Sequence, residues 1–159
     1  MKLYHASPVK NLKILEPKRT ISNDKYIGDF VFATRYRKLA LMYMLPKGFP
    51  ILMNIKSSKP YVVLCGNAED ILKKDTGGAL YVLSTKSFSK TPQSGLSDYE
   101  MVSKKTVNPL NETDYKSTIK ALASESIEIY FVDSNTFEKL IFNPEQDSMV
   151  KTLIKFKPQ

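Results

Sequence analysis

The chain has very little cysteine and histidine. Cys65 is the only cysteine and His5 the only histidine in 159 residues. A single cysteine excludes an intrachain disulfide, and the sequence has no cysteine and histidine cluster with the spacing of metal ligands. We therefore expect a reducing compartment and no metal. Cys65 itself belongs to an apolar run typical of a buried strand, where a thiol is usually inert.

Long hydrophobic runs are also missing. The longest uninterrupted apolar stretch covers residues 39–45, far short of the roughly 20 residues that a membrane-spanning helix needs. The first residues lack the apolar core of a signal peptide. There are no internal repeats, and no glycine-rich loop precedes a Lys-Ser or Lys-Thr pair at the start of a helix, which excludes a P-loop. We expect a cytoplasmic protein without a membrane partner.

What the chain does have is an ordinary globular composition with an excess of positive charge. Hydrophobic residues make up 42% and charged residues 25%, so we expect one domain over residues 1–159. The net charge of +8 favours anionic partners such as nucleotides, nucleic acid or an acidic protein. The basic residues stand in short, scattered pairs, however, and a merely solvated basic surface stays the simpler interpretation.

Short apolar and β-branched runs bounded by turn residues predict strands. They lie at 30–34, 51–55, 61–65, 79–83, 99–103 and 127–133, and in the last of them alternation suggests one buried face. Helical periodicity predicts helices at 35–45, 67–74, 112–126, 134–141 and 145–155, with Asn111 as the N-cap of the third. Strands and helices do not alternate regularly, so the α+β class is favoured. Residues 84–98 are expected to form a loop.

Four segments together resemble a known family. They are "LYHAS" at 3–7, "FVFATRYRKLALMY" at 30–43, "GGALYVL" at 77–83 and "DYEMVSKKTVNP" at 98–109. In this order they resemble the ADP-ribosyltransferase fold in its His-Tyr-Glu branch, which includes the poly(ADP-ribose) polymerases, the rifampin-modifying transferases and the RNA 2'-phosphotransferases. The resemblance implies two mainly antiparallel sheets around a cleft with flanking helices, and NAD as a substrate.

The resemblance gives Glu100 the catalytic role. Breaking the glycosidic bond of NAD builds positive charge on the ribose, and a carboxylate held nearby stabilises that charge. Tyr43 would stack on the nicotinamide, with Tyr36 as the substitute. Taken one at a time, Glu100 could equally be an exposed glutamate on a polar sheet face, and Tyr43 a core tyrosine packed beside Leu39.

The N-terminal segment would bind the same ligand. His5 would exchange hydrogen bonds with ribose hydroxyls in one fixed tautomer, assisted by Ser7. A core histidine satisfied by backbone groups is the alternative. Two positions depart from the family pattern: Ala6 stands where many members have a glycine whose backbone approaches the nicotinamide amide, and Phe32 stands where the polymerases would have a tyrosine.

The remaining binding residues follow from charge and position. The pyrophosphate needs cations or backbone N–H groups, and Arg19 with Lys18, in the loop between the first two predicted strands, is the first choice, with Arg35 the second. The loop at 84–98 precedes Glu100 and corresponds to the acceptor-recognition turn of the family. Phe88 and Ser97 are therefore expected near the substrate.

The sequence thus predicts an NAD-dependent ADP-ribosyltransferase acting on an unknown acceptor, which could be a protein, a nucleic acid or a small molecule. Roles as a toxin, a drug modifier or a housekeeping enzyme all stay open. Two rivals remain. One is an enzyme like the RNA 2'-phosphotransferases, which the positive charge would suit. The other is a non-catalytic nucleotide-binding or nucleic-acid-binding module of the same fold, which Ala6 and Phe32 would favour.

Overall fold

The chain forms two compact units. The computed structural model describes residues 1–23, 26–90 and 99–159. The first unit combines Met1–Met44 with Gly78–Lys116, and the second combines Leu45–Gly77 with Ser117–Gln159. Each unit is built on one sheet, and antiparallel pairing predominates over the two sheets together. The predicted α+β class is therefore confirmed, whereas a single domain over the whole chain stays a prediction.

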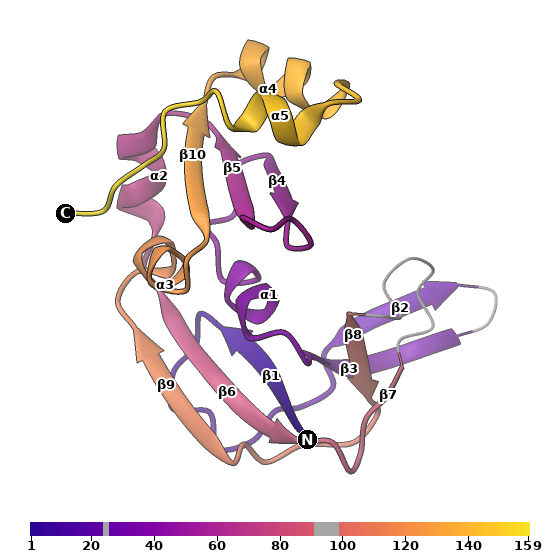
Figure 1. Cartoon of the computed structure of the whole chain (residues 1–159). Coiled ribbons are helices and arrows are strands. Elements are labelled where there is room, and N and C mark those ends of the chain that lie inside the picture. The colour runs from indigo at the N-terminus through magenta and orange to yellow at the C-terminus, as the bar shows by residue number, and fades with distance from the viewer. Residues whose placement is uncertain (24–25, 91–98) are drawn as a thin grey trace. The chain divides into compact units, whose positions relative to one another are not determined.

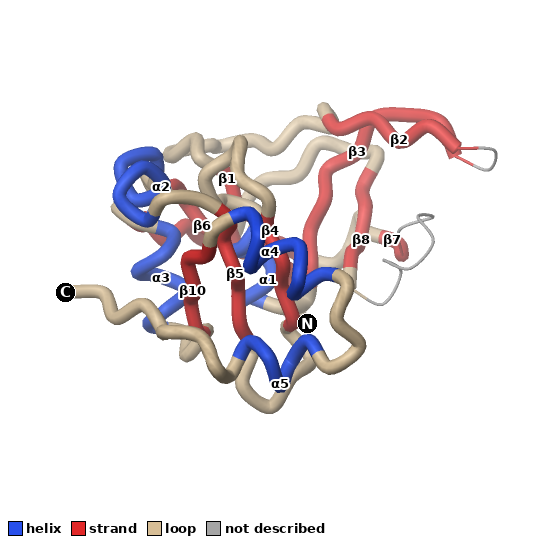
Figure 2. Tube along the Cα trace, turned by 90° about the horizontal axis from the view of Figure 1, so that it is seen from above, coloured by secondary structure: helices blue, strands red, loops and turns tan. Residues whose placement is uncertain are grey.

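The first unit is organised by a seven-stranded antiparallel sheet (Figure 1). Its main path runs in the order β7-β8-β3-β1-β6-β9, and β2 pairs with β3 in addition. Figure 2 shows β2 and the first half of β3, which pairs with it, extending away from the other strands of this unit. The strands are β1 (Lys2–Ser7), β2 (Arg19–Asn23), β3 (Tyr26–Thr34), β6 (Gly78–Ser84), β7 (Ser89–Lys90), β8 (Glu100–Ser103) and β9 (Asn111–Tyr115).

The sheet splits between β1 and β3. Strand β1 pairs with β6 from Lys2 to Ser7, but its register with β3 consists of Tyr4 opposite Thr34. Beyond Tyr4 the two strands are no longer held together by a ladder. A seam therefore opens in the middle of the sheet, beside His5.

Apolar side chains fix this sheet on both faces. One face carries a buried cluster: Leu3, Leu15, Val31, Ala33, Ala79, Tyr81, Leu83 and Val107. A second cluster joins Phe30 and Phe32 of β3 to Val102 of β8. Helix α1 (Arg37–Met42) contacts β1 and β3 and buries its last four residues.

Gly78 shows how closely the strands approach at one end of this sheet. A Cβ atom added there would lie 2.3 Å from the backbone oxygen of Ser7 and 2.8 Å from Sδ of Met44. Backbone atoms cannot retreat as a flexible side chain can, so any larger residue would push β1 away from β6. The glycine in "GGALYVL" therefore holds the end of β1, and with it the residues after His5, in place.

The second unit contains a three-stranded sheet covered by helices. Its order is β10-β5-β4, with β10 parallel and β4 antiparallel to the central β5. These strands are β4 (Ile51–Asn54), β5 (Tyr61–Cys65) and β10 (Glu128–Val132), and the helices are α2 (Ala68–Lys74), α3 (Thr118–Ser124), α4 (Ser134–Ile141) and α5 (Gln146–Val150). Every residue of β5 is buried, which is typical of a strand covered on both faces.

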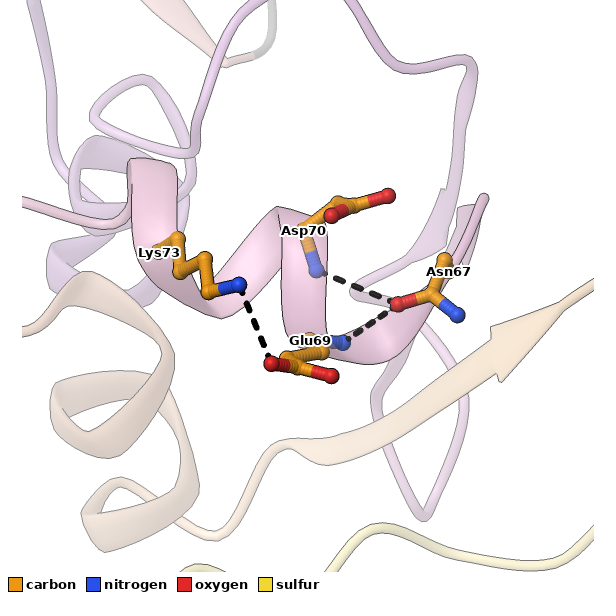
Figure 3. Close-up of polar contacts among 4 residues, drawn as sticks. All are labelled: Asn67, Glu69, Asp70 and Lys73. Atoms are coloured by element: carbon orange, nitrogen blue, oxygen red, sulfur yellow. Dashed lines mark hydrogen bonds and ion pairs between the residues drawn. The ribbon is translucent and has the colours of Figure 1, made fainter.

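Helix α2 shows its sequence signals directly (Figure 3). The side chain of Asn67 accepts hydrogen bonds from the backbone N–H groups of Glu69 and Asp70 at 2.9 and 3.2 Å, which is an N-cap. Lys73 pairs with Glu69 one turn earlier at 3.0 Å. The helix predicted at 67–74 is thereby confirmed.

The helix predicted at 112–126 is only half right. Residues Asn111–Tyr115 form β9, which pairs with β6, and α3 begins at Thr118 with Ser117 as its N-cap. The spacing from Tyr115 to the following apolar residues imitates a helical face, but β9 completes the edge of the sheet, and this tertiary pairing overrides the local pattern.

Smaller differences from the predicted elements concern two loops, the last helix and the burial of β10. Residues 19–23 form β2 where a loop was expected, and the predicted helix at 145–155 shortens to α5. Within the loop expected at 84–98, Ser89–Lys90 form β7, and residues 91–98 lie outside the described part of the chain. Both Ile129 and Tyr130 of β10 are buried, so this strand has two covered faces where one was expected. No helix in the described part of the chain is long and apolar enough to cross a membrane.

Candidate functional site

The sheet places the predicted catalytic glutamate at a strand end. Glu100 is the first residue of β8 and lies opposite Thr34, the last residue of β3, which in turn lies opposite Tyr4 of β1. Residues directly opposite each other in antiparallel strands share a face. Glu100 therefore lies on the face of Tyr4 and Thr34, and β3 separates it from the seam.

Tyr43 contacts Glu100 directly. Its hydroxyl donates a hydrogen bond of 2.5 Å to Oε1 of Glu100. Tyr43 is the C-cap residue of α1, so the helix brings it from a position 57 residues away in sequence. Glu100 is 2% exposed and Tyr43 is 43% exposed. The alternatives of an exposed glutamate and a core tyrosine are therefore wrong, and the tyrosine connects a buried carboxylate to the surface.

The second oxygen of this carboxylate lacks a partner. Oε2 of Glu100 is buried and accepts no hydrogen bond from residues 1–23, 26–90 or 99–159. Leaving a buried polar group unpaired costs about 1–3 kcal/mol, and more for a charged group. Carboxylate oxygens only accept, so the natural complement of Oε2 is a donor from a bound ligand.

His5 lies in the seam, with one nitrogen engaged. Its Nδ1 is 2.7 Å from the carbonyl oxygen of Phe32. Because a carbonyl only accepts, Nδ1 carries the hydrogen and Nε2 of the neutral ring is an acceptor. Burial lowers the pKa of His5 below its ordinary value, and the bond to Phe32 opposes this less strongly. The ring is therefore neutral near neutral pH, and the bond to Phe32 holds it in one tautomer.

The structure does not bring His5 onto Glu100 by direct contact. The pleat turns His5 toward Tyr81, its register partner on β6, and the two ring centroids are 6.3 Å apart. The bond to the Phe32 backbone is what a structural histidine would make. His5 thus contacts the backbone of Phe32 and the ring of Tyr81, and of the three predicted residues only Tyr43 and Glu100 touch.

Tyr36 occupies a different position from Tyr43. It is the N-cap residue of α1, and its ring lies 5.8 Å from that of Tyr99, with an angle of 47° between the rings. Its backbone N–H donates to Oγ1 of Thr34 at 3.1 Å. Tyr36 and Tyr43 therefore stand at opposite ends of one short helix, and Tyr36 meets the residue that precedes Glu100.

The other predicted binding residues have mixed positions. The ring of Phe32 is packed in the core, so only its backbone oxygen takes part in the seam. Oγ of Ser7 accepts a bond from the backbone N–H of Val9 at 3.1 Å. Ala6 pairs with Leu80 of β6 and thus lies along the same seam as His5.

The predicted pyrophosphate and acceptor residues are less well placed. Arg19 begins β2 and is not in a loop, and its side chain lies outside what the structure describes. Lys18 is exposed and pairs with Glu16 at 3.3 Å, and Arg35 is exposed just after β3. Phe88 packs against the core cluster of the sheet. Ser97 lies outside the described residues.

Two residues that support the site were not singled out from the sequence. Thr34, fully buried, aligns Glu100 across the strands and anchors Tyr36. Tyr81 is fully buried, and its hydroxyl donates to the carbonyl oxygen of Val9 at 2.8 Å while accepting from the N–H of Leu12 at 3.2 Å. A tyrosine inside an apolar strand is the signal for such a role, because its hydroxyl needs a partner when buried.

Comparison of the chain with protein-family models, curated proteins and solved structures found no match. In the part of the chain that the structure describes, no three His, Cys, Asp or Glu side chains are grouped to hold a metal ion.

Proposed function

We propose that the chain is an NAD-dependent ADP-ribosyltransferase of the His-Tyr-Glu type, with an ADP-ribosyltransferase-like fold, which transfers ADP-ribose to an acceptor. The observation that supports this most is the Tyr43–Glu100 pair with its buried, unpaired Oε2. A structural glutamate would have both oxygens satisfied. An oxygen that is dry and without a partner fits a carboxylate that binds a ligand hydroxyl.

The reaction would use this carboxylate electrostatically. NAD supplies a ribosyl group on a good leaving group: the bond from ribose C1' to the nicotinamide nitrogen breaks, and its electron pair stays with nicotinamide. The acceptor nucleophile forms the new bond to C1' and loses its proton to solvent. Glu100 would accept a hydrogen bond from a ribose hydroxyl through Oε2 and stabilise the positive charge that develops on the ribose.

Tyr43 and His5 would position the same ligand. The hydroxyl of Tyr43 fixes the carboxylate through Oε1, and its exposed ring offers a surface on which the cationic nicotinamide can stack. In His5, the bond from Nδ1 to Phe32 leaves Nε2 to accept from a second hydroxyl. The roles of Glu100 and His5 require ligand hydroxyls as donors, which the ribose of NAD provides.

The test is nicotinamide release from NAD by the purified protein. We expect Glu100→Gln, which keeps the shape and removes the charge, to lower the rate by about 100-fold or more, the usual loss when one electrostatic group is removed from a preorganised site. Glu69→Gln is the matched control, because Glu69 is exposed on α2. A Glu100→Gln rate within a few fold of wild type would show that the carboxylate is not catalytic.

A further inference from the structure

The positive charge of the chain is concentrated in the unit that holds the candidate site. Lysine and arginine outnumber aspartate and glutamate two to one in residues 1–44 and 78–116, and they are nearly balanced in the second unit. A scattered, merely solvating charge would be shared between the units. The first unit is therefore the part of the molecule that would attract a polyanion.

An exposed tyrosine rests on a half-buried one directly before Glu100, the proposed catalytic residue. Tyr36 is 48% exposed and rests against Tyr99, whereas Tyr61, Tyr81 and Tyr130 are buried. The backbone of Tyr36 is fixed on both sides: its N–H bonds Thr34, and its carbonyl oxygen accepts from the N–H of Ala40 at 3.0 Å. A ring that is held in place yet half in solvent can stack on a ligand at little entropic cost.

Basic residues continue from this pair along the adjoining strands. Arg35 precedes Tyr36, and Lys104 and Lys105 follow the far end of β8, all three exposed. Lys90 of β7 is exposed opposite Met101, midway along β8. From Glu100 to Ser103 the strand rise covers about 10 Å. Exposed cations thus border β8 from the tyrosine pair to its far end.

We infer that the acceptor of the proposed transfer is a single-stranded nucleic acid, which lies along β8 and stacks a base on Tyr36. Cations that follow the backbone together with an aromatic ring for a base are the usual elements of single-strand binding. Duplex DNA is disfavoured for this surface because its bases are stacked inside the duplex and cannot lie on the ring of Tyr36. An acidic protein would use the charges but would not require the stacked tyrosine.

This inference rests on the proposed function, and the transfer breaks and forms the same bonds as described above. A ring nitrogen or a hydroxyl of the nucleotide forms the bond to ribose C1', nicotinamide leaves with the electron pair of the broken bond, and the nucleophile releases its proton. Glu100 directly follows Tyr99 in sequence, so the proposed stacking surface and the proposed catalytic residue belong to one short stretch of chain.

Binding is measured first, by fluorescence anisotropy with labelled single-stranded RNA and DNA of the same sequence. We expect Tyr36→Ala to weaken binding by about 5- to 150-fold, the fold-change that corresponds to one base stack. Tyr36→Phe, which keeps the ring, should stay within about threefold of wild type, since stacking needs only the ring face. Phe142→Ala is the matched control, because Phe142 is 83% exposed but lies in the second unit.

Charge is tested separately by the salt dependence of binding. Arg35→Gln and Lys105→Gln should each lower the slope of log affinity against log salt by about one. A duplex of the same sequence should bind more weakly than either single strand. Equal binding by duplex, or binding indifferent to Tyr36→Ala, would overturn the proposed surface.

Transfer is then measured with labelled NAD and the strand that binds best. Label incorporated into the strand supports the inference, and the RNA and DNA arms show which one is the acceptor. Nicotinamide release with label appearing only in protein or free ADP-ribose would overturn the inference and leave the proposed function standing. Strand binding that depends on Tyr36, without nicotinamide release, would overturn the transfer and support the binding surface alone.

Discussion

Replacing Glu100 by methionine should make the protein more stable and inactive at the same time. Methionine is unbranched, similar in length and easily accommodated in a core. The substitution removes a charge that is 2% exposed and has one oxygen without a partner in the described part of the chain. It also removes the bond from Tyr43 to Oε1.

The magnitude follows from these two opposing effects. Burying an ion costs several kcal/mol after relaxation, and a hydrogen bond to a charged group returns about 1.5–3 kcal/mol. The net expectation is a gain of about 1–2 kcal/mol in the free energy of unfolding for Glu100→Met. In a chain of this size each kcal/mol moves Tm by about 2–4 °C, so Tm should rise by about 2–8 °C.

Thermal unfolding followed by circular dichroism, together with urea titration, measures this gain. Glu69→Met is the control, since a substitution on an exposed helix face changes stability by about 0.5 kcal/mol or less. A Glu100→Met protein that is about 1 kcal/mol or more less stable than wild type would refute the reasoning. The carboxylate would then be a satisfied structural group, and the argument for a ligand-binding oxygen would fail with it.

A stabilising change at a single polar residue has a functional meaning. Proteins keep an unfavourable buried group where binding or catalysis requires it. A ligand whose hydroxyl satisfies Oε2 should therefore raise the Tm of the wild type and leave that of Glu100→Met nearly unchanged, because stabilisation by a ligand requires binding to the folded state. The stability of Glu100→Met and the ligand-induced rise in Tm together distinguish a carboxylate kept for ligand binding from one that is only poorly packed.

Two further predictions concern His5 in the first unit and Asp75 in the second unit. Because burial lowers the pKa of His5 below 6.5, the unfolded chain binds a proton first on acidification, so stability should fall as pH drops through 6.5 toward the lower folded value. His5→Asn should lose less stability than wild type between about pH 7 and about pH 5 in urea titrations, and equal losses would contradict the assignment. Asp75 accepts bonds from Oγ of Ser117 at 2.5 Å and from the N–H groups of Thr118 and Ile119 at 2.8 and 3.0 Å. Asp75→Ala should therefore cost about 1–3 kcal/mol by the same measurement, and a loss below about 0.5 kcal/mol would contradict its role as an anchor of α3.

Local sequence patterns correctly predicted the strands with apolar runs and the helix with a clear N-cap residue. The six strands inferred from apolar runs all form, and the helix at 67–74 begins where Asn67 caps it. The segment at 112–126 failed because a polar edge strand has no alternation of its own: β9 exists only because β6 is there to pair with it. Likewise β2 is defined by its partner β3 and not by its own composition.

The sequence could predict which residues belong to the candidate site, but not which of them contact each other. The motifs indicated Glu100 and Tyr43, and the structure joins them by one hydrogen bond across 57 residues. His5 was indicated by the same resemblance, yet its bond to Phe32 and its turn toward Tyr81 depend on the splitting of β1 from β3. The sequence pattern of β1 alone cannot predict this split, because the split depends on how β1 and β3 pair.

The spacing of residues in the sequence does not determine the register between two strands. That register decides whether Glu100 and Tyr43 meet. A slip of one residue between β3 and β8 would turn Glu100 to the opposite face and separate it from Tyr43. What prevents the slip is apolar packing two residues further along, where Phe32 lies opposite Val102 and both are buried together with Phe30. The same register that buries these three side chains must bury Glu100, the next residue but one on that face of β8. The unfavourable position of the carboxylate is thus imposed by the core of the sheet, and the chain cannot relieve it locally without losing the packing that defines the fold.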